Sequence, residues 1–447
     1  MDVFIRMFRA RNGNGTIGHL RNIGHLLSGN VLSNVLALAS LAIVGRAMET
    51  ELFGVFVLII TYVRLVERLV RFESWQPLIH FASDLEAGQR DRLPRLYLYG
   101  ILLDIGAAMV AAVGAVVIAA LAGPLFGLDG HYLHLVAIYA VSVLTNITGS
   151  STAALRMAGR FKQIAYTQPI GQIVRVPLAL FCWYFWPTIT GFMVAWTIAQ
   201  MTTGVFILAL GWSALKAQSI SNPFKESPRN LARDFPGFIN FAWSSNLSMT
   251  MRTMTQEADV LLVGALAGPS SAGFYHVAKR LARVAQQVGA QTQAVLYPEM
   301  ARFWAEKRYR KLRKLTRNVQ LILSGLGLVS VAVAALIGQQ VVELAMGVHY
   351  GQVGPLLVAQ LIAVTLMMHA APSRSILLSM GQPGIVLKSS FVATVLFFAC
   401  AVLLIPRFGA LGANFAHIAF AGTTALWMDI AWYGLIRRRI SEKAGAD

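Results

Sequence analysis

Hydrophobic positions along this chain come in long continuous runs, such as ILLDIGAAMVAAVGAVVIAALAG (101–123) and FVATVLFFACAVLLI (391–405). A helix of about 20 apolar residues crosses a hydrocarbon core of roughly 30 Å. Strands of a membrane barrel would instead be about 10 residues long and would alternate in polarity. The pattern therefore predicts an all-α polytopic membrane protein.

Twelve runs of this kind can be delimited, and the polar stretch 214–235 is the longest interruption between them. It divides the chain into six predicted spans followed by six more. The predicted spans are 24–45, 53–82, 96–121, 133–155, 164–186, 189–213, 236–266, 271–299, 319–341, 353–378, 385–405 and 411–436. The predicted domains are a tail (1–22), a first lobe (23–213), a linker (214–235), a second lobe (236–436) and a tail (437–447).

The two halves repeat each other. Gly54 and Gly273, the motifs RLPRL (92–96) and KLRKL (311–315), and Pro187 and Pro406 are each separated by the same number of residues. One shared offset at three places indicates duplication of a six-span segment, so both halves should cross the membrane in the same orientation. Transporters with this layout commonly bind substrate between their halves. We therefore expect two six-helix bundles around a central cleft.

Charge is distributed unevenly along the chain. It has 38 Lys and Arg against 20 Asp and Glu, a net charge of +18, which by itself could suggest a nucleic-acid partner. The basic residues in the loops, however, gather on alternate loops, and the opposite set contains only Arg46 and Arg407. Cytosolic loops carry such an excess of Lys and Arg. This predicts that both termini are cytosolic and that the partner is a lipid bilayer, with no nucleic acid.

Ionisable residues interrupt two of the apolar runs. In the second predicted span Arg64, Glu67, Arg68 and Arg71 share one helical face. A charge at the bilayer centre costs roughly 2.5–3.5 kcal/mol on insertion scales, so this face should meet protein or a water-filled cavity. The eighth predicted span contains Lys279, Arg280 and Arg283, and the seventh contains Arg252. Arg64, Arg252 and Arg283 fall at similar depths, which predicts that they converge on one level.

Basic residues outnumber acidic ones within the spans, which predicts a site for an anion. Arginine presents a planar fork that suits phosphate. The predicted anion-binding residues are Arg64, Arg68, Arg71, Arg252, Lys279, Arg280 and Arg283, with Asn30, Asn34, Asn246 and Gln287 as polar residues of the cavity. Two structural alternatives stay open. Glu67 can pair with a neighbouring arginine, and small polar residues in spans often only hold helices together.

Two carboxylates are candidates for a gate or for coupling to a proton or Na⁺ gradient, namely Glu67 and Asp259. Asp259 should lie at the depth of Lys279 and Arg280, where an ion pair could be a gate or a static salt bridge. Cys182 and Cys400 lie within spans, and no Cys/His cluster has the spacing of a metal site. We expect no catalytic residues, no metal and no cofactor, and a transporter rather than an enzyme.

Three stretches resemble the polysaccharide transporter family: ADVLLVGALAGPSSAGFYHVAKRL (258–281), LYPEMARFWAEKRYRKLRKL (296–315) and LLIPRFGALGANFAHIAFA (403–421). This family includes O-antigen and exopolysaccharide flippases of the multidrug/oligosaccharidyl-lipid/polysaccharide exporter superfamily. The resemblance implies a V-shaped pair of bundles in a bacterial inner membrane. It also implies alternating-access transfer of a polyprenyl-pyrophosphate-linked oligosaccharide from the cytosolic to the periplasmic leaflet. Spans one, two, seven and eight would line the cleft, and these are the spans with polar stripes.

The implied pathway is lipopolysaccharide O-antigen or exopolysaccharide synthesis, with a polymerase and glycosyltransferases as partners of a monomeric transporter. Three alternatives remain at this point. A multidrug antiporter of the same superfamily would need cavity carboxylates, which the arginine excess disfavours. A lipid II flippase is expected to have fourteen spans. A polysaccharide polymerase or ligase would usually have a large extracytoplasmic loop, and none is predicted.

Overall fold

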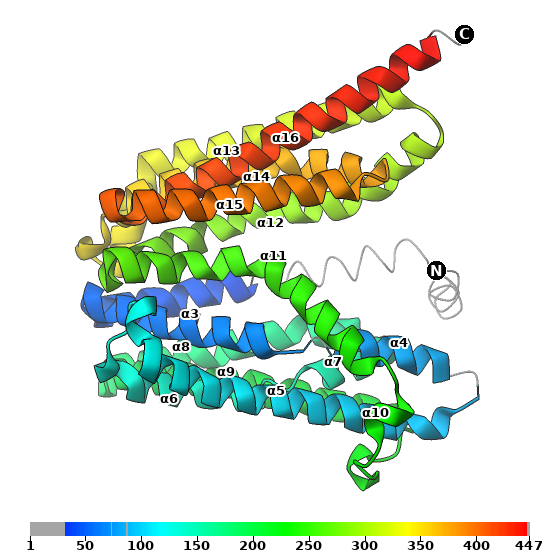
Figure 1. The fold of residues 1–447 in the computed structure, drawn as a ribbon. Helices are drawn as coiled ribbons and strands as arrows, with labels where there is room; N and C mark the ends of the chain where they lie inside the picture. Colours follow the sequence, from blue (N-terminus) through cyan, green and yellow to red (C-terminus); the bar gives the residue numbers. More distant parts are fainter. Residues whose placement is uncertain (1–31, 73, 86–87, 445–447) are drawn as a thin grey trace. The chain divides into compact units, whose positions relative to one another are not determined.

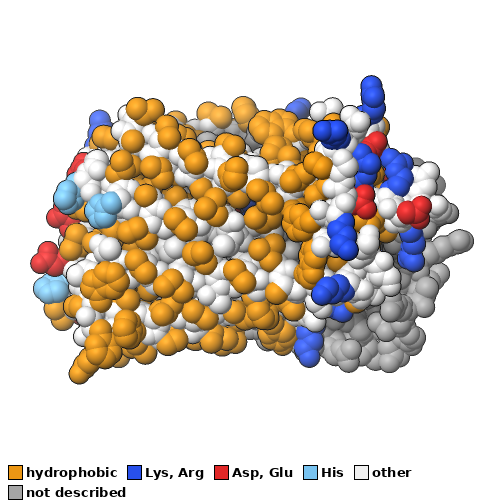
Figure 2. Space-filling model, turned by 90° about the horizontal axis from the view of Figure 1, so that it is seen from below, with side chains coloured by type: hydrophobic (Ala, Val, Ile, Leu, Met, Phe, Trp, Pro, Cys, Tyr) orange, Lys and Arg blue, Asp and Glu red, His pale blue; other side chains and the backbone are white. Residues whose placement is uncertain are grey.

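The computed structural model describes residues 32–72, 74–85 and 88–444, apart from the side chains of 168, 247–256, 288–295 and 442–444. Every element assigned within these ranges is an α-helix or a 3-10 helix. Six of the described segments are long and apolar enough to cross a membrane, and a shorter apolar helix spans Leu32–Ala47. Figure 2 shows one face on which hydrophobic side chains form a broad band, with most visible Lys and Arg at one end of it. The prediction of an all-α polytopic membrane protein is confirmed.

The chain forms two compact units. The first comprises Met1–Met48, Ile59–Pro124 and Asp129–Met254. Its α5 packs against α6, and α9 packs against α7 and α8 (Figure 1). Its helices are most of α3 (Thr50–Val70), α4 (Trp75–Leu85), α5 (Leu93–Ala122), α6 (Leu133–Ala140), α7 (Gly149–Met157), α8 (Phe161–Phe185), α9 (Ile189–Ala217), α10 (Leu231–Asp234) and the first part of α11 (Phe238–Ala267).

The second unit comprises Glu49–Leu58, Leu125–Leu128 and Thr255–Asp447. Its α14 packs against α12, α13 and α16, and α15 packs on α16 (Figure 1). Besides parts of α3 and α11, its helices are α12 (Pro269–Ala305), α13 (Tyr309–Met346), α14 (Val353–Ser379), α15 (Pro383–Phe408) and α16 (Ala410–Ala444). The predicted boundary between lobes at 214–235 stays a prediction.

Several of these helices begin or end at a proline or glycine whose backbone conformation suits a helix end. α12 starts with Pro269 directly after Gly268, whose φ is +86°. Proline suits the first turn because its missing N–H has no helical partner there, and its φ is fixed near the helical value. α13 ends at Gly347, where φ is +106°. Glycine adopts this left-handed conformation without the penalty that a Cβ would add. The connections between long helices can therefore stay short.

Two predicted spans are broken, contrary to the continuous helices expected from hydropathy. The run 53–82 forms α3 and α4, with residues 71, 72 and 74 outside either helix, and Pro77 lies in the first turn of α4. The run 133–155 forms α6, the 3-10 helix η4 (Val141–Thr145) and α7, with 146–148 outside any helix. Non-helical backbone at membrane depth is tolerated where protein or a cavity satisfies its polar groups. Side chains from other elements form hydrogen bonds at the second break and at the start of α7.

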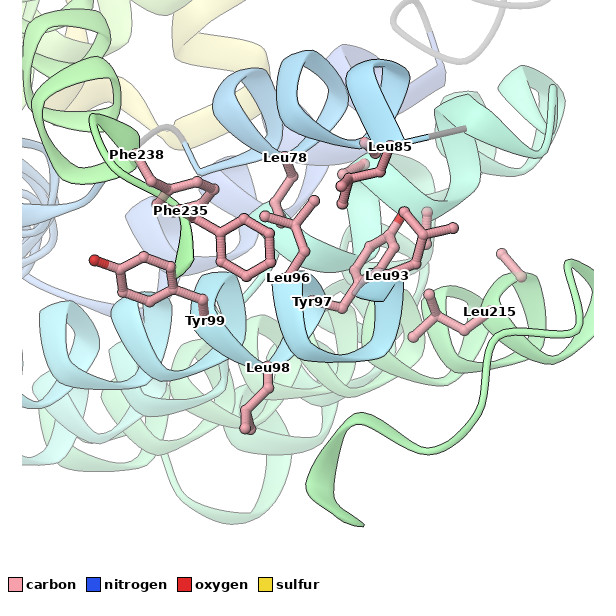
Figure 3. Packing of buried hydrophobic residues seen from close by; sticks show 14 of the residues in the cluster. Leu78, Leu85, Leu93, Leu96, Tyr97, Leu98, Tyr99, Leu215, Phe235 and Phe238 are labelled. Carbon is pink, nitrogen blue, oxygen red and sulfur yellow. The ribbon is translucent and has the colours of Figure 1, made fainter. Parts of the chain in front are cut away.

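A hydrophobic cluster fixes α4 in the first unit. Leu78 and Leu85 of α4 face Leu93, Leu96 and Tyr97 of α5 in Figure 3. Phe238, at the start of α11, stacks on Tyr99 of α5 with ring centroids 4.7 Å apart. Members of this cluster are between 0% and 9% exposed, so α4 is an integral part of the unit's core rather than a surface appendage. This packing helps to set the direction of α4 after the end of α3.

The repeat-related glycines Gly54 and Gly273 face each other within the second unit. A Cβ added to Gly273 would lie 3.0 Å from the ring of Phe53 and 3.2 Å from the Cα of Gly54. A Cβ added to Gly54 would collide with the backbone carbonyl of Pro269. Small residues of this kind let two membrane helices approach closely. The start of α3 and the start of α12 can touch here only because both positions are glycine.

Candidate functional site

The end of α3 supplies polar side chains to the break between η4 and α7. Glu67 and Arg71 form an ion pair at 3.5 Å. Asn146 Nδ2 donates a hydrogen bond to Glu67 Oε1, and Arg71 donates to the hydroxyl of Thr148. Of the three arginines predicted as possible partners of Glu67, Arg71 forms an ion pair with it in the described structure. The carboxylate and guanidinium therefore satisfy each other and the side chains of Asn146 and Thr148 in the broken segment.

Asp104 of α5 caps the short helix that follows this break. Its Oδ2 accepts hydrogen bonds from the backbone N–H of Ser150 at 3.0 Å and from the hydroxyl of Ser150 at 3.1 Å. Asp104 is buried, and Arg71 is close enough to attract its carboxylate. A carboxylate at a helix N-terminus satisfies free N–H groups and interacts favourably with the helix dipole. Asp104 therefore holds α7 in place from inside the unit.

A small cavity lies among these groups. Its polar lining consists of Glu67, Arg71, Asp104 and Asn146, and its apolar lining is Ala107, Ala108, Ala111 and Val143. The volume open to the centre of a water molecule is about 10 Å³, which is room for about one water. Two carboxylates beside one guanidinium could hold a proton or a small cation. An oligosaccharide could not enter this space.

The other predicted residues of the first unit have different surroundings. Arg64 and Asn34 are half-buried, and Arg68 is exposed. Asn246 is buried and donates a hydrogen bond to the carbonyl of Leu69 at 3.3 Å, which satisfies a carbonyl near the end of α3. Asn30 and the side chain of Arg252 lie outside the described residues. The common level predicted for Arg64, Arg252 and Arg283 stays a prediction.

A buried carboxylate organises the second unit. Asp259 of α11 is 0% exposed, and its Oδ2 lies 2.7 Å from Nζ of Lys279 on α12. The hydroxyl of Tyr275 donates to the same oxygen at 2.8 Å, and Nε2 of His417 on α16 lies 2.8 Å from it. The predicted ion pair is thus formed by Lys279. Asp259 links three helices and meets one full positive charge and one titratable imidazole.

A second carboxylate network joins α13, α14 and α16. Asp429 lies 2.8 Å from Nε2 of His369, whose Nδ1 lies 2.8 Å from the hydroxyl of Ser324. Its other oxygen accepts from Gln320 Nε2 at 2.9 Å and from Trp432 Nε1 at 3.0 Å, and Ser373 also donates to it. Asp429 therefore accepts hydrogen bonds from several side chains in addition to its contact with His369. This arrangement can hold or transfer a proton between a carboxylate, an imidazole and a hydroxyl.

Sequence reasoning missed several of these partners. Tyr275 precedes Lys279 by one helical turn, and this i, i+4 spacing could have placed both on one face of α12. His417 and His369 are isolated histidines in apolar helices, and no local pattern connects either to its carboxylate. The predicted residues Arg280, Arg283 and Gln287 are half-buried on α12. Their roles in an anion site remain predictions.

The chain is similar to proteins of known class. Residues 19–304 match the family described as "Polysaccharide biosynthesis protein". The Inner membrane protein YghQ of Escherichia coli (strain K12) is 26% identical over 332 residues, which is 74% of this chain and 93% of that protein. Both the family match and this relative cover well over half of the chain.

Solved structures show the same fold. The lipid II flippase MurJ in an inward closed conformation aligns with a TM-score of 0.72 at 13% identity, over 91% of this chain and 87% of that one. An inward-facing multidrug resistance transporter of the MATE family aligns with a TM-score of 0.68 at 15% identity, over 92% of this chain and 95% of that one. Identities this low establish the fold alone. Together with the family match, they confirm the resemblance to polysaccharide transporters, and the chain belongs to the polysaccharide biosynthesis protein family.

Proposed function

We propose that this protein is a flippase for polyprenyl-pyrophosphate-linked oligosaccharides. It would move each repeat unit from the cytosolic to the periplasmic leaflet by alternating access, for synthesis of O-antigen or exopolysaccharide. The observation that carries the proposal is the charge at the end of α3. Arg64 and Arg68 of α3, and Arg71 directly after it, accompany Glu67, whereas the other carboxylate of the helix, Glu51, lies in its first turn. A membrane helix with this excess of arginine suits an anionic lipid head group better than a cationic drug.

The basic residues of α11 and α12 are proposed to act on the same substrate. Lys279 is held by Asp259, whereas Arg280 and Arg283 are half-buried. With Arg252 they would offer counter-charge to the pyrophosphate as it passes. Arg283→Ala should abolish glycan export while leaving the protein in the membrane. Arg283→Lys should restore export only in part, because lysine lacks the bidentate fork.

The buried cluster around Asp259 is proposed as a gate that couples transport to an ion gradient. The imidazole of His417, 2.8 Å from Asp259, can accept a proton, which favours a proton over Na⁺ as the coupling ion. Glu67, held by Arg71 and Asn146 beside the small cavity, is the corresponding candidate in the first unit. Transport assays at opposite pH gradients would test the choice of ion. A rate that depends on Na⁺ and not on pH would reject it.

The proposed site of action is the bacterial inner membrane, with both termini in the cytosol. The relative from Escherichia coli bears the name of an inner membrane protein, which supports this placement. A reporter fused after Lys443 should be active in the cytosol only, and periplasmic activity would overturn the topology. The protein would work as a monomer beside glycosyltransferases and a polymerase.

Export of cationic drugs is the second candidate function, favoured by the likeness to the MATE transporter. Such transport needs a carboxylate whose charge a drug can neutralise. Asp259 already faces Lys279 and His417 at 2.7 Å and 2.8 Å, so its charge is compensated. This observation weighs against drug export and for the flippase.

Deletion of the protein in its native cell, followed by mass analysis of lipid-linked sugars, tests the proposed function. Polyprenyl-pyrophosphate-linked repeat units should accumulate, and surface polysaccharide should fall. Both effects should reverse when the intact protein is restored. Normal levels of lipid-linked sugars together with new sensitivity to cationic drugs would reject the flippase function and favour export of cationic drugs.

A further inference from the structure

The polar stretch 214–235 is held on the first unit by two arginines at the start of α5. Arg95 Nη2 lies 2.8 Å from Oδ2 of Asp234. Arg92 donates to the backbone carbonyl of Asp234 at 3.0 Å, and its guanidinium carbon lies 5.2 Å from the ring centroid of Phe235. Both arginines are half-buried. The motif RLPRL therefore binds a segment of the chain through a carboxylate and a backbone carbonyl.

The internal repeat places basic residues at the same two positions of the second unit. Lys311 and Lys314 of the motif KLRKL correspond to Arg92 and Arg95 of RLPRL. The leucine that follows the first basic residue of each motif is buried in the core of its own unit. The two motifs therefore turn the same face to the core. The lysines of the second unit lie on the surface that corresponds to the segment-binding surface of the first.

This surface of the second unit is open in the described structure. After α9 ends at Ala217, the chain packs on α5 through η5 (Pro223–Lys225) and α10. The corresponding helix of the second unit, α16, instead continues as one helix to Ala444 (Figure 1). Lys311 and Lys314 are exposed, whereas their counterparts in the first unit are half-buried. The second unit thus has the basic positions without a segment over them.

Two arginines enlarge the basic surface at the start of α13. The exposed basic side chains on one face of this helix, which form the α13 basic surface, are Arg310, Lys311, Lys314 and Arg317. Among the side chains that the structure describes, none of these four forms an ion pair, whereas the nearby Arg308 pairs with Glu306 at 3.1 Å. Like charges one turn apart on a helix destabilise it. A negatively charged partner would relieve this repulsion.

We propose that the α13 basic surface binds an acidic segment of another protein, as the start of α5 binds a segment of this chain. Basic clusters recognise acidic segments by charge complementarity. Anionic lipid head groups also carry negative charge. A protein segment is favoured because a carboxylate and a backbone carbonyl lie against the corresponding arginines of the first unit. The proposal rests on the predicted cytosolic position of residues 301–318 and is independent of the transported substrate.

Fluorescence anisotropy of the full chain in phosphatidylcholine nanodiscs tests the surface, with fluorescein-labelled hexaglutamate as the probe and labelled hexaglutamine as the peptide control. Hexaglutamate should bind the wild type, and hexaglutamine should not. Lys311→Glu combined with Lys314→Glu should weaken the apparent affinity at least about tenfold, because two attractive contacts become repulsive. The corresponding pair of Gln substitutions should have a smaller effect. Undiminished binding by the Glu pair, or no binding by the wild type, would overturn the proposal.

The matched control is Lys216→Glu combined with Lys225→Glu, which changes the net charge by the same amount. Both lysines are exposed in the first unit, so this variant should bind hexaglutamate as the wild type does. An equal loss in both double variants would reduce the effect to net charge and reject the surface. Substitution of the exposed Lys311 and Lys314 should leave the melting temperature unchanged. A markedly lower value with both Glu and Gln would show that the lysines support the fold and would reject a docking role.

A second arm separates a protein partner from a lipid. In nanodiscs that contain phosphatidylglycerol, hexaglutamate binding by the wild type should weaken but persist. Complete loss of peptide binding, with phosphatidylglycerol retained by the wild type and not by the Glu pair in native mass spectrometry, would assign the surface to lipid head groups and reject a protein partner. Accumulation of lipid-linked sugars in deletion cells tests the flippase function by itself, so either proposal can fail while the other stands.

Discussion

Asp259 and Lys279 form a buried ion pair, with Nζ 2.7 Å from Oδ2 and the carboxylate 0% exposed. They lie on consecutive helices, α11 and α12, which are joined at Gly268. Tyr275 and His417 bring further hydrogen-bonding atoms to the same carboxylate. The free-energy cost of removing two charges from water is offset only when the pair has good geometry and further hydrogen bonds, as this pair has. The pair therefore couples three helices of the second unit through one carboxylate.

Breaking this pair should be strongly destabilising. Asp259→Ala should lower the free energy of unfolding by roughly 3–5 kcal/mol, because it removes the buried counter-charge of Lys279. Chemical or thermal unfolding in detergent measures the loss. Glu299→Ala is the matched control. Its pair with Arg302 is 4.0 Å long, with side chains 47% and 62% exposed, and its removal should cost no more than about 1 kcal/mol.

The charge swap of Asp259→Lys with Lys279→Asp separates a gate from a static pair. The double variant should fold, since the pair of charges is kept. It should not transport, because the carboxylate at position 279 would no longer lie beside Tyr275 and His417. Recovery of full transport with unchanged pH dependence would show that the pair is structural only.

The close contact between Gly54 and Gly273 should leave no room for a side chain at position 54. Gly54→Leu would drive its side chain into the backbone of Pro269, and we expect a loss of about 1–3 kcal/mol or more from overpacking. Unfolding in detergent and yield of membrane-inserted protein report the effect. Gly114→Ala on α5 is the control, since a Cβ there meets nothing within 4 Å. It should be neutral or stabilising by up to about 1 kcal/mol. Equal behaviour of the two variants would contradict the close approach of α3 and α12.

Removal of the cap on α7 should loosen the first unit. Asp104→Ala leaves the backbone N–H and the hydroxyl of Ser150 without their acceptor, which should cost about 1–3 kcal/mol. Hydrogen exchange of α7 amides measures the local effect. Asp129→Ala is the control, because Asp129 precedes the 3-10 helix Gly130–Tyr132 without a side-chain capping bond. Unchanged protection of α7 in Asp104→Ala would argue against the cap.

The pair of His369 and Asp429 should behave as one energetic unit. A double-mutant cycle with His369→Ala and Asp429→Ala should give a coupling energy of about 0.5–3 kcal/mol. The contact of 2.8 Å between Nε2 and Oδ2 is the physical reason. The same cycle with exposed His349, which shares no partner with Asp429, should be additive. Additivity for His369 would mean that the network contributes nothing to stability.

The sequence predicts most of the helices well, because hydropathy depends on local composition. Asp259 and Lys279 could be paired in advance, since one short turn joins their helices. The partners His417 and His369 could not, because each meets its carboxylate across a large sequence separation that no periodicity encodes.

Hydropathy also failed at the two helix breaks, for the same physical reason. Residues 130–157 form one segment that is long and apolar enough to cross a membrane, and nothing within it demands that 146–148 leave the helix. Glu67, Arg71 and Asp104 stabilise the break from other elements. A prediction based on one segment at a time cannot contain such partners.

These breaks carry a consequence for biogenesis. The three side chains that satisfy the interrupted segment all precede it in the chain, so each has already left the ribosome when residues 146–148 are synthesised. The segment can therefore insert as one hydrophobic stretch and bend later, when Asp104 and the end of α3 are already within the bilayer. Every residue that lines this polar cavity precedes Thr255–Asp447, which makes up most of the second unit, so the cavity can assemble during translation before that segment is synthesised.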